Sequence, residues 1–339
     1  MGLKQYRENQ KRPSETMQIV RYSKEKSSEW DDFVKASRNG TFLFLRGYMD
    51  YHSDRFEDHS LMYYNDKGKL LAVLPSNERT TDGKKALFSH QGLTYGGFVL
   101  SLSAKSADVL EIFSVTKDYL KAHEFSEFHY KQIPIPYHKH PSQEDEYALW
   151  TNGTELECCK LGTAVSLKTA PKEFLRMVRA TKKTDRNRLL RMGYTIEIDA
   201  ELEDFWPVLT GNLMKSFGVL PVHTLDEIQL LKERFPENIV CCVIRNTEGV
   251  VEAGTVLYLM DNVVHTQYIS ASETGKNTNA LDCLLLSLLL HYREQEKYSF
   301  FDFGTSMDDD NVHLKPGLIA QKEGFGGRGI VYKQFILRL

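Results

Sequence analysis

The sequence predicts an α+β protein made of two similar domains, and three observations lead to this prediction. The chain has 339 residues, more than the roughly 250–300 residues that usually share one hydrophobic core. Both halves follow the same order of strands, a loop, a helix and a further strand, which is typical of paired α+β domains. A polar connector with three prolines, residues 134–146, lies between the halves. We therefore expect one domain over 17–150 and a second over 151–339.

Local patterns predict each element of the first half. Apolar residues at helical spacing indicate helices, and short apolar runs bounded by turn residues indicate strands. The turn-like tetrapeptide 65–68 joins two strands into a hairpin, and the polar residues 2–16 are left out of the fold. We expect, in order, a strand at 17–22, a helix at 27–37, strands at 60–64 and 69–76, a glycine-rich loop at 92–97, a helix at 105–123 and a strand at 125–133.

The second half repeats this order at greater length. Pro171 stands where a long helix would begin, because proline is tolerated in the first helical turn, and Gly193 follows the expected end of that helix. We expect a strand at 159–167, this helix at 171–192, a strand at 194–198, helices at 201–217 and 225–234, antiparallel strands at 239–245, 249–260 and 262–270, a buried helix at 279–295, and strands at 299–303 and 329–339.

Composition and charge exclude several classes of protein. Hydrophobic residues make up 41% of the chain, as in ordinary soluble proteins, and the longest apolar stretch, 283–290, is far shorter than the roughly 20 residues of a membrane-spanning helix. With 43 basic and 46 acidic residues, the net charge of −3 lacks the basic excess of a dedicated nucleic-acid binder. The five cysteines form no C-x-x-C motif, which argues against a disulfide framework and a structural zinc site. We expect a cytoplasmic protein without a transmembrane segment.

The segment 271–277, between a strand and a helix, is a candidate phosphate-binding loop. Small residues that open a helix leave backbone N–H groups oriented toward one point, where the helix dipole adds positive potential. The candidate cofactor-binding residues of this region are Ser270, Gly275, Lys276 and Asn277. The alternative is that Asn277 or Thr278 only caps a structural helix.

A basic segment covers residues 172–191, where eight Lys or Arg residues and two acidic residues leave a local charge of +6. On a helix, such side chains could hold the phosphates of a nucleotide-linked substrate or of tRNA, and Arg186 is the candidate we select. The alternative is a solvated helix face. No aromatic residues alternate with these charges, which disfavours the stacking of nucleic-acid bases.

Candidate proton carriers occur on two of the expected strands. Asp302 lies among phenylalanines, where an acidic group is costly unless it is hydrogen-bonded or paired, so it either orients a partner, acts as a base or bonds nearby backbone donors. His265 and Gln267 are expected on one strand face, with Thr266 and Tyr268 on the other. His265 and Tyr268 are reasonable proton carriers for the acylation of an amine, although a lone strand histidine can equally be structural. No serine-hydrolase order, H-E-x-x-H or Walker loop is present.

The C-terminal segments carry a resemblance to a known family. Residues 301–306 (FDFGTS), Gly317-Leu318 and 322–329 (KEGFGGRG) resemble the end of FemAB-like acyltransferases of the GNAT (GCN5-related N-acetyltransferase) superfamily. The basic segment 184–191 also resembles that family, and segments 221–224 and 235–239 resemble a subgroup associated with bacterial surface-polysaccharide genes. The sequence departs from the family pattern at Lys315-Pro316, at Gln321, and in the loop Ser272-x-x-Gly275-x-Asn277. No coiled-coil arm of the kind that grips tRNA interrupts the second half.

The resemblance implies an α/β sandwich of two tandem GNAT-like domains, each with a mixed, mostly antiparallel sheet flanked by helices. It implies acetyl-CoA or another acyl-CoA as co-substrate on the strand 264–270, with no metal, and an amine that attacks the acyl carbonyl directly. The candidate catalytic residues are then His265, Tyr268 and Asp302. The candidate substrate-binding residues are His223, Arg186, Lys322 and Tyr95.

The leading hypothesis is transfer of an acyl group from a CoA thioester to an amine, on an amino sugar of a surface polysaccharide or cell-envelope precursor. The acceptor would be a small molecule, or linked to a nucleotide or a lipid. The first alternative is aminoacyl transfer from aminoacyl-tRNA, which the basic segment favours. The second is a non-catalytic ligand-binding relative. The identity of the acceptor and the oligomeric state stay open.

Overall fold

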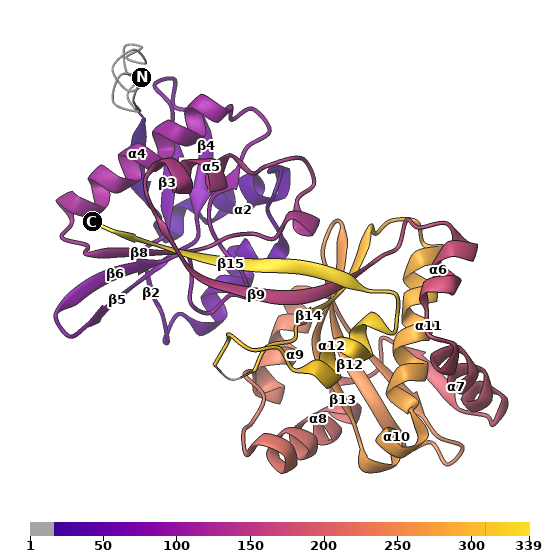
Figure 1. Cartoon of the computed structure of the whole chain (residues 1–339). Coiled ribbons are helices and arrows are strands. Elements are labelled where there is room, and N and C mark those ends of the chain that lie inside the picture. Colours follow the sequence, from indigo (N-terminus) through magenta and orange to yellow (C-terminus); the bar gives the residue numbers. More distant parts are fainter. Residues whose placement is uncertain (1–16, 309) are drawn as a thin grey trace.

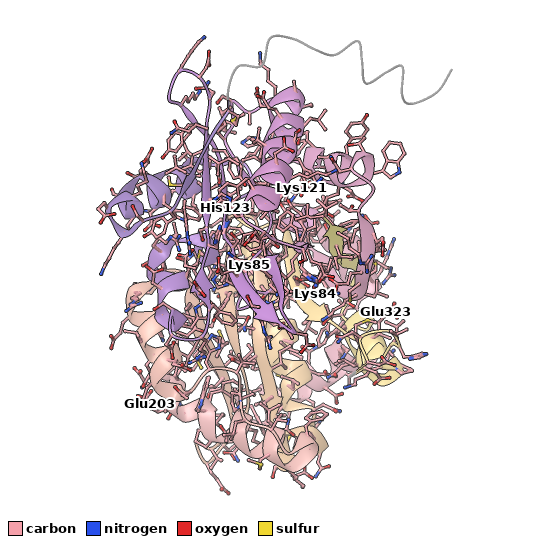
Figure 2. All side chains as sticks on the ribbon, turned by 90° about the vertical axis from the view of Figure 1, so that its left-hand side faces the viewer. Lys84, Lys85, Lys121, His123, Glu203 and Glu323 are labelled. Atoms are coloured by element: carbon pink, nitrogen blue, oxygen red, sulfur yellow. The ribbon has the colours of Figure 1, made fainter. Side chains whose placement is uncertain are left out.

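The structure is a computed structural model that describes residues 17–308 and 310–339, so the segment 2–16 lies outside the described residues. The two halves lie side by side, and two long strands, β9 (Glu155–Ser166) and β15 (Arg328–Arg338), run through both (Figure 1). The view turned by 90° again places the first half above the second (Figure 2). Within the described residues, no helix combines the length and apolar character needed to cross a bilayer.

The first half contains the predicted hairpin and the predicted long helix, together with a further hairpin (β5–β6) that we did not predict. Its strands are β1 (Gln18–Arg21), β2 (Glu57–Asp58), β3 (Leu61–Tyr64), β4 (Leu70–Leu74), β5 (Asn77–Thr81), β6 (Lys84–Phe88), β7 (Val99–Leu100) and β8 (Glu127–Lys131). Its helices are α2 (Ser27–Ala36), α3 (Arg46–Met49), α4 (Ser106–Ala122) and α5 (Glu144–Thr151), with the 3-10 turns η1 (Lys24–Lys26), η2 (Phe42–Phe44), η3 (Asp50–His52) and η4 (Ile135–Tyr137).

The second half follows the predicted order closely. After β9 come the elements α6 (Pro171–Met177), α7 (Ala180–Arg191), β10 (Thr195–Ile198), α8 (Leu202–Phe217), α9 (Leu225–Arg234), β11 (Ile239–Arg245), β12 (Val251–Leu259), β13 (Val263–Ala271), α10 (Glu273–Thr278), α11 (Ala280–Glu294), β14 (Phe300–Thr305) and α12 (Pro316–Glu323).

One long sheet joins the two halves. Its eleven strands are ordered β10-β11-β12-β13-β14-β9-β15-β8-β6-β5-β2, and a separate sheet is ordered β1-β3-β4-β7. The last residues of the chain pair with β8 of the first half, in the register Phe335↔Tyr130, so the C-terminal strand completes the sheet of the first half. The domain limits 17–150 and 151–339 remain a prediction, and β9 and β15 are shared between the two regions.

Three apolar clusters hold this arrangement together. One packs α4 and α5 against the strands of the first half, and a second packs α7 and α11 on one face of the second half. The third lies between the halves and combines Phe42 and Tyr95 of the first with Phe205 and Tyr258 of the second. Burial of apolar area in this third cluster stabilises the contact between the halves.

Two irregularities in β13 determine how His265 and Tyr268 are placed. The strand pairs in parallel with β14 only from Val263 to His265, so from Thr266 onward it has no β14 partner. Its register with β12 also shifts, with Tyr258 opposite His265 but Val256 opposite Tyr268. Gln267 is therefore the extra residue of a β-bulge, which adds one residue to one strand only. Because of this bulge, the expectation that His265 and Tyr268 lie on opposite faces is wrong, and both face the cluster between the halves.

Two further expectations are corrected. The helix expected at 171–192 is two helices, α6 and α7, because Val178 is extended and Arg179, with a ψ of 135°, is also outside the helical conformation. Val178 is buried, and the backbone N–H of Arg179 donates to the carbonyl of Gly324, 2.8 Å away, outside the helix. The loop expected at 271–277 contains the short helix α10. Asn279, in a left-handed conformation with φ of 64°, separates α10 from α11.

Candidate active site

Asp302 is the centre of a buried hydrogen-bond cluster between the halves. Its Oδ2 accepts hydrogen bonds from the hydroxyl of Tyr137 at 2.5 Å, from Nδ1 of His265 at 3.2 Å and from the hydroxyl of Tyr332. Its Oδ1 accepts from the backbone N–H of Gly304 at 2.8 Å. The Asp302 side chain is completely buried, and these donors offset the cost of removing a carboxylate from water. We refer to Asp302, His265, Tyr137 and Tyr332 as the Asp302 cluster.

The cluster also assigns the protons of His265. Tyr137 and Tyr332 each have one hydroxyl proton, and both donate it to Asp302. The Nδ1 of His265, which also lies 2.9 Å from the Tyr137 oxygen, must therefore carry its own proton and donate it. The neutral imidazole then has an unprotonated Nε2, which forms no hydrogen bond to any residue that the structure describes. A lone pair held in this way can accept a proton.

The electrostatics favour an ionised Asp302. Burial by itself would raise the pKa of the carboxyl group, but the hydrogen bonds from His265, Tyr137 and Tyr332 outweigh it and hold the pKa below the usual value. For Tyr137 and Tyr332, burial and the charge of Asp302 raise the pKa well above the usual value. The phenols thus stay protonated and act as donors.

Sequence reasoning selected His265 and Asp302 but missed Tyr137 and Tyr332. Tyr137 lies in η4, inside the proline-containing connector, and its ring packs against that of Tyr95 with centroids 4.6 Å apart. The predicted residue Tyr95 therefore supports the cluster through Tyr137. The sequence feature nearest to Tyr137 was the group of prolines at 134–136, and it indicated a domain boundary rather than a functional site.

Lys322 lies next to this cluster but is not directed at it. Its Nζ donates to the carbonyl oxygens of Gly304 at 3.1 Å and Thr305 at 2.6 Å, and so ties α12 to the end of β14. Burial lowers the pKa of Lys322 to about 8, although the charge of Asp302 acts in the opposite direction. The geometry gives Lys322 a positioning role on the strand that carries Asp302.

Tyr268 belongs to a second polar group on the same face, with His223. The Tyr268 hydroxyl lies 2.5 Å from Nδ1 of His223 and accepts the backbone N–H of His223 at 3.2 Å, so its own proton goes to Nδ1. Burial lowers the pKa of His223 to about 4 and raises that of Tyr268 to about 12. The three candidate catalytic residues are therefore divided between two places on the face.

A cavity of about 310 Å³ adjoins the Asp302 cluster. Its wall includes Tyr332 of the cluster and Thr305 at the end of β14, together with Thr94, Lys131, Lys160 and Lys333. The larger cavity of about 430 Å³ is lined by α4, α5 and the loop before α5, and none of its lining residues belongs to the Asp302 cluster. Of these two cavities, the smaller one therefore shares a residue with the Asp302 cluster. Within the described residues, no group of three or more His, Cys, Asp or Glu side chains could hold a metal ion.

Of the candidate cofactor-binding residues, Ser270 lies near the far end of β13, roughly 17 Å from His265 along the strand at about 3.3 Å per residue. The other three lie in α10. The N–H of Gly275 donates to the hydroxyl of Ser272, the N-cap of α10, at 3.0 Å. The ammonium of Lys276 contacts Asn212 at 2.6 Å and Glu273 at 3.1 Å. Ser270 donates to the carbonyl of Val208, and Asn277 lies inside α10. Several donors of the expected phosphate loop are thus bonded within the protein.

Arg186 lies apart from both polar groups. Its Nε donates to the hydroxyl of Ser287 at 2.7 Å, which joins α7 to α11. On the same helix, Lys182 is buried and bonds Asp282 at 2.7 Å, and Arg188 bonds Asp185 and the carbonyl of Thr278. Much of the basic segment therefore serves the packing of α7 against its neighbours.

Comparison with known proteins gives a clear result for the fold. No family model and no curated protein matches the chain. Among solved structures, FemX matches with a TM-score of 0.70 at 11% identity, over 95% of this chain and 97% of that one. The chain therefore has a FemAB-like fold.

Two further structures share this FemAB-like fold. The DUF2156 domain of a protein described as a lysylphosphatidylglycerol synthetase, from Agrobacterium fabrum, has a TM-score of 0.58 at 14% identity, over 93% of this chain and 92% of that one. A tandem GNAT protein from the clavulanic acid pathway has a TM-score of 0.51 at 10% identity, over 95% of this chain and 98% of that one. The predicted fold class is confirmed.

Proposed function

We propose that this protein transfers an acyl group to an amine, with His265 as the proton acceptor. The observation that carries the proposal is the unbonded Nε2 of His265, on a ring that Asp302 orients at the point where β13 separates from β14. A histidine oriented by a buried carboxylate is a suitable general base near neutral pH. The FemAB-like fold, which is common among acyltransferases, supports the same reaction class.

The chemistry of the proposed reaction is simple. An amine arrives protonated, so His265 Nε2 takes one proton and Asp302 stabilises the imidazolium that forms. The neutral amine then attacks the acyl carbonyl, a C–N bond forms, and the bond from the carbonyl to the donor sulfur or oxygen breaks. The His265 imidazolium returns its proton to the leaving group, and the second amine proton is released to solvent as the amide forms. The protein therefore contributes alignment and proton transfer.

For the donor we propose a CoA-type thioester. From Thr266 to Ala271 the backbone of β13 has no strand partner on the β14 side, so its free groups could bond the pantetheine chain of the co-substrate. The expected phosphate loop supports this donor less well, because the N–H of Gly275 and the ammonium of Lys276 already have partners.

Aminoacyl transfer is the second candidate, and those bonded loop donors favour it. A donor without the CoA pyrophosphate would not need the loop at all. The similar structure described as a lysylphosphatidylglycerol synthetase carries an aminoacylated lipid in its name. For the acceptor we keep an amino sugar of an envelope or polysaccharide precursor. The five unpaired cysteines fit a reducing compartment such as the cytosol.

One experiment compares both donors. Purified full-length protein is incubated with acetyl-CoA, longer acyl-CoA thioesters or a mixture of aminoacyl-tRNAs, each with a set of amino-sugar nucleotides, and products are followed by mass spectrometry. We expect an acylated amine with one donor class, and its loss in His265→Ala. Turnover that is unchanged in His265→Ala would contradict the proposed role of His265. Lack of product with every donor would contradict acyl transfer to this acceptor class.

A further inference from the structure

The cavity beside Tyr332 is unusual in the charge of its wall. Lys131, Lys160 and Lys333 all line it, and no acidic residue does. The ammonium group of Lys333 forms an ion pair with Glu146, which is not one of the residues that line the cavity. Like charges collected around one space repel one another, and the repulsion is relieved when an anion enters.

Lys131 is built into the wall rather than exposed at a surface. Its Nζ donates to the carbonyl oxygens of Leu93 at 2.9 Å, Gln91 at 3.2 Å and His90 at 3.4 Å. Burial, with a smaller contribution from the nearby charge of Lys160, lowers the pKa of Lys131 to about 8. At pH 7 the group remains largely charged, so it contributes a fixed positive field inside the cavity.

Lys160 is the lysine whose ammonium group remains available to a ligand. It lies on β9 directly opposite Tyr332 of β15, and cross-strand partners project from the same face of a sheet. No described residue forms a hydrogen bond or ion pair with its ammonium group. Thr94 adds a hydroxyl to the same wall. A charged donor, a hydroxyl and two further positive charges are the groups that bind phosphate oxygens.

We propose that this cavity binds a phosphate or diphosphate group of the amine acceptor, with Lys160 as its principal contact. The inference rests on the proposed acyl transfer for the identity of the ligand as an acceptor. The volume of about 310 Å³ is near the lower end for small-molecule sites, which suits an anionic group with part of a sugar rather than a whole nucleotide.

The position of the cavity fits an acceptor. Tyr332 forms part of its wall and also donates its hydroxyl to Asp302. An anion held by Lys160 would thus lie against Tyr332, the member of the Asp302 cluster that also bonds Asp302. Binding energy from a phosphate remote from the reacting amine would orient the amine toward His265, which is a common use of such contacts.

The test measures binding of inorganic pyrophosphate to the full chain by calorimetry, at low and moderate salt and without any acyl donor. We expect one saturable site in the wild type that weakens as salt rises. Lys160→Ala should weaken binding about tenfold or more, because a charge-assisted contact is lost. Lys160→Arg, which keeps the charge, should retain binding within about threefold of the wild type.

The matched control is Lys84→Ala, because Lys84 is exposed at the start of β6 (Figure 2) and is not one of the residues that line the cavity. It should bind pyrophosphate as the wild type does, and thermal unfolding should show that all variants fold. Absence of saturable binding, or equal weakening in the Lys160 and Lys84 variants, would overturn the proposal. Competition by UDP and by vesicles that contain phosphatidylglycerol then distinguishes a nucleotide-linked from a lipid-linked phosphate.

Binding and turnover separate the two proposals. If pyrophosphate binds in a Lys160-dependent way while no acyl transfer occurs, the anion site stands and the proposed reaction fails. If acyl transfer occurs but pyrophosphate binding does not depend on Lys160, the reaction stands and the anion site fails.

Discussion

At the scale of single residues, the Asp302 cluster is the feature that links structure to chemistry. Burial of an aspartate among phenylalanines is tolerated here because its two oxygens accept four hydrogen bonds. One of those donors, His265, is held in the tautomer that leaves Nε2 free. The same contacts therefore stabilise the fold and prepare a proton acceptor.

Replacement of His265 by Ala should separate these two roles. We expect kcat to fall about 100-fold or more, since general-base catalysis commonly contributes that much. The melting temperature should change by only a few degrees, because Asp302 keeps three of its donors. Product formation and circular-dichroism melts are the two measurements. The control is His123→Ala at the C-cap of α4 (Figure 2), which should leave kcat and the melting temperature unchanged. An equal effect in the two variants would argue against a chemical role for His265.

Replacement of Asp302 by Asn should instead act mainly on stability. The amide presents its own donors to Tyr137 and Tyr332, so buried hydroxyl groups lose their acceptor. We expect the free energy of unfolding to fall by about 3–5 kcal/mol, measured by urea denaturation. A loss below about 1 kcal/mol would mean that the carboxylate is not the common acceptor of the cluster.

At the scale of elements, two strand irregularities create the site. The bulge at Gln267 turns Tyr268 to the face of His265. In β14, the register against β9 shifts between Asp302 and Thr305, and Gly304 within that shift has a φ of 68°. A side chain is strained in this conformation, so glycine permits the bend that brings its own N–H to Asp302.

Gly304→Ala tests this bend. A built Cβ would lie 3.6 Å from the ring of His265, so space is adequate and the cost comes from the backbone. We expect a loss of about 1–2 kcal/mol in the free energy of unfolding. The matched substitution is Gly211→Ala in α8, where no atom lies within 4 Å, and it should stabilise the protein by up to about 1 kcal/mol. Equal effects in urea titrations of the two variants would contradict a special role for Gly304.

At the scale of the whole molecule, buried histidines belong to a group of stacked rings to which both halves contribute. The ring of His52 stacks on that of His90, with centroids 5.2 Å apart, and Tyr51 stacks on His223 at 5.5 Å. Burial lowers the pKa of His52, lowers that of His90 to about 3 and lowers that of His223 to about 4. These histidines are therefore neutral in the folded protein at physiological pH.

This arrangement predicts loss of stability in acid. The unfolded chain binds protons on histidine near pH 6.5, whereas the folded chain does so only near pH 3–4. The unfolded state thus binds more protons, and the stabilisation, complete above about pH 6.5, falls as the pH drops toward 4. We expect His90 alone to contribute a loss of about 2–3 kcal/mol over this interval.

Urea denaturation between pH 7.5 and pH 4.5 measures how steeply the free energy of unfolding falls with pH. His90→Asn, which tolerates the positive φ of 61° at this position, should flatten the decline. His123→Asn, at an exposed position on the end of α4, should leave it as in the wild type. A slope that is the same in all three proteins would show that His90 does not drive the acid sensitivity.

Local sequence patterns predicted much of the fold. The limits of α9 and β11 match the expected 225–234 and 239–245, since Thr224 and Glu227 form a capping box at the start of the helix and tight turns bound the strand. The helix expected at 171–192 is interrupted at Val178 and Arg179. There burial of Val178 and the bond from Arg179 to Gly324 outweighed a helical pattern, and neither contact is visible in local sequence.

The order of elements and the family resemblance were available from the chain itself, because periodicity, caps and turns act over a few residues. The contact of Tyr137 with His265 and Asp302 could not be predicted from the chain, since Tyr137 lies 128 positions from His265 and 165 positions from Asp302. No local pattern relates a tyrosine in a proline-containing connector to strands of the second half. Their contact depends on how β9 and β15 cross between the halves and on a one-residue bulge, and these features exist only when the whole sheet has formed.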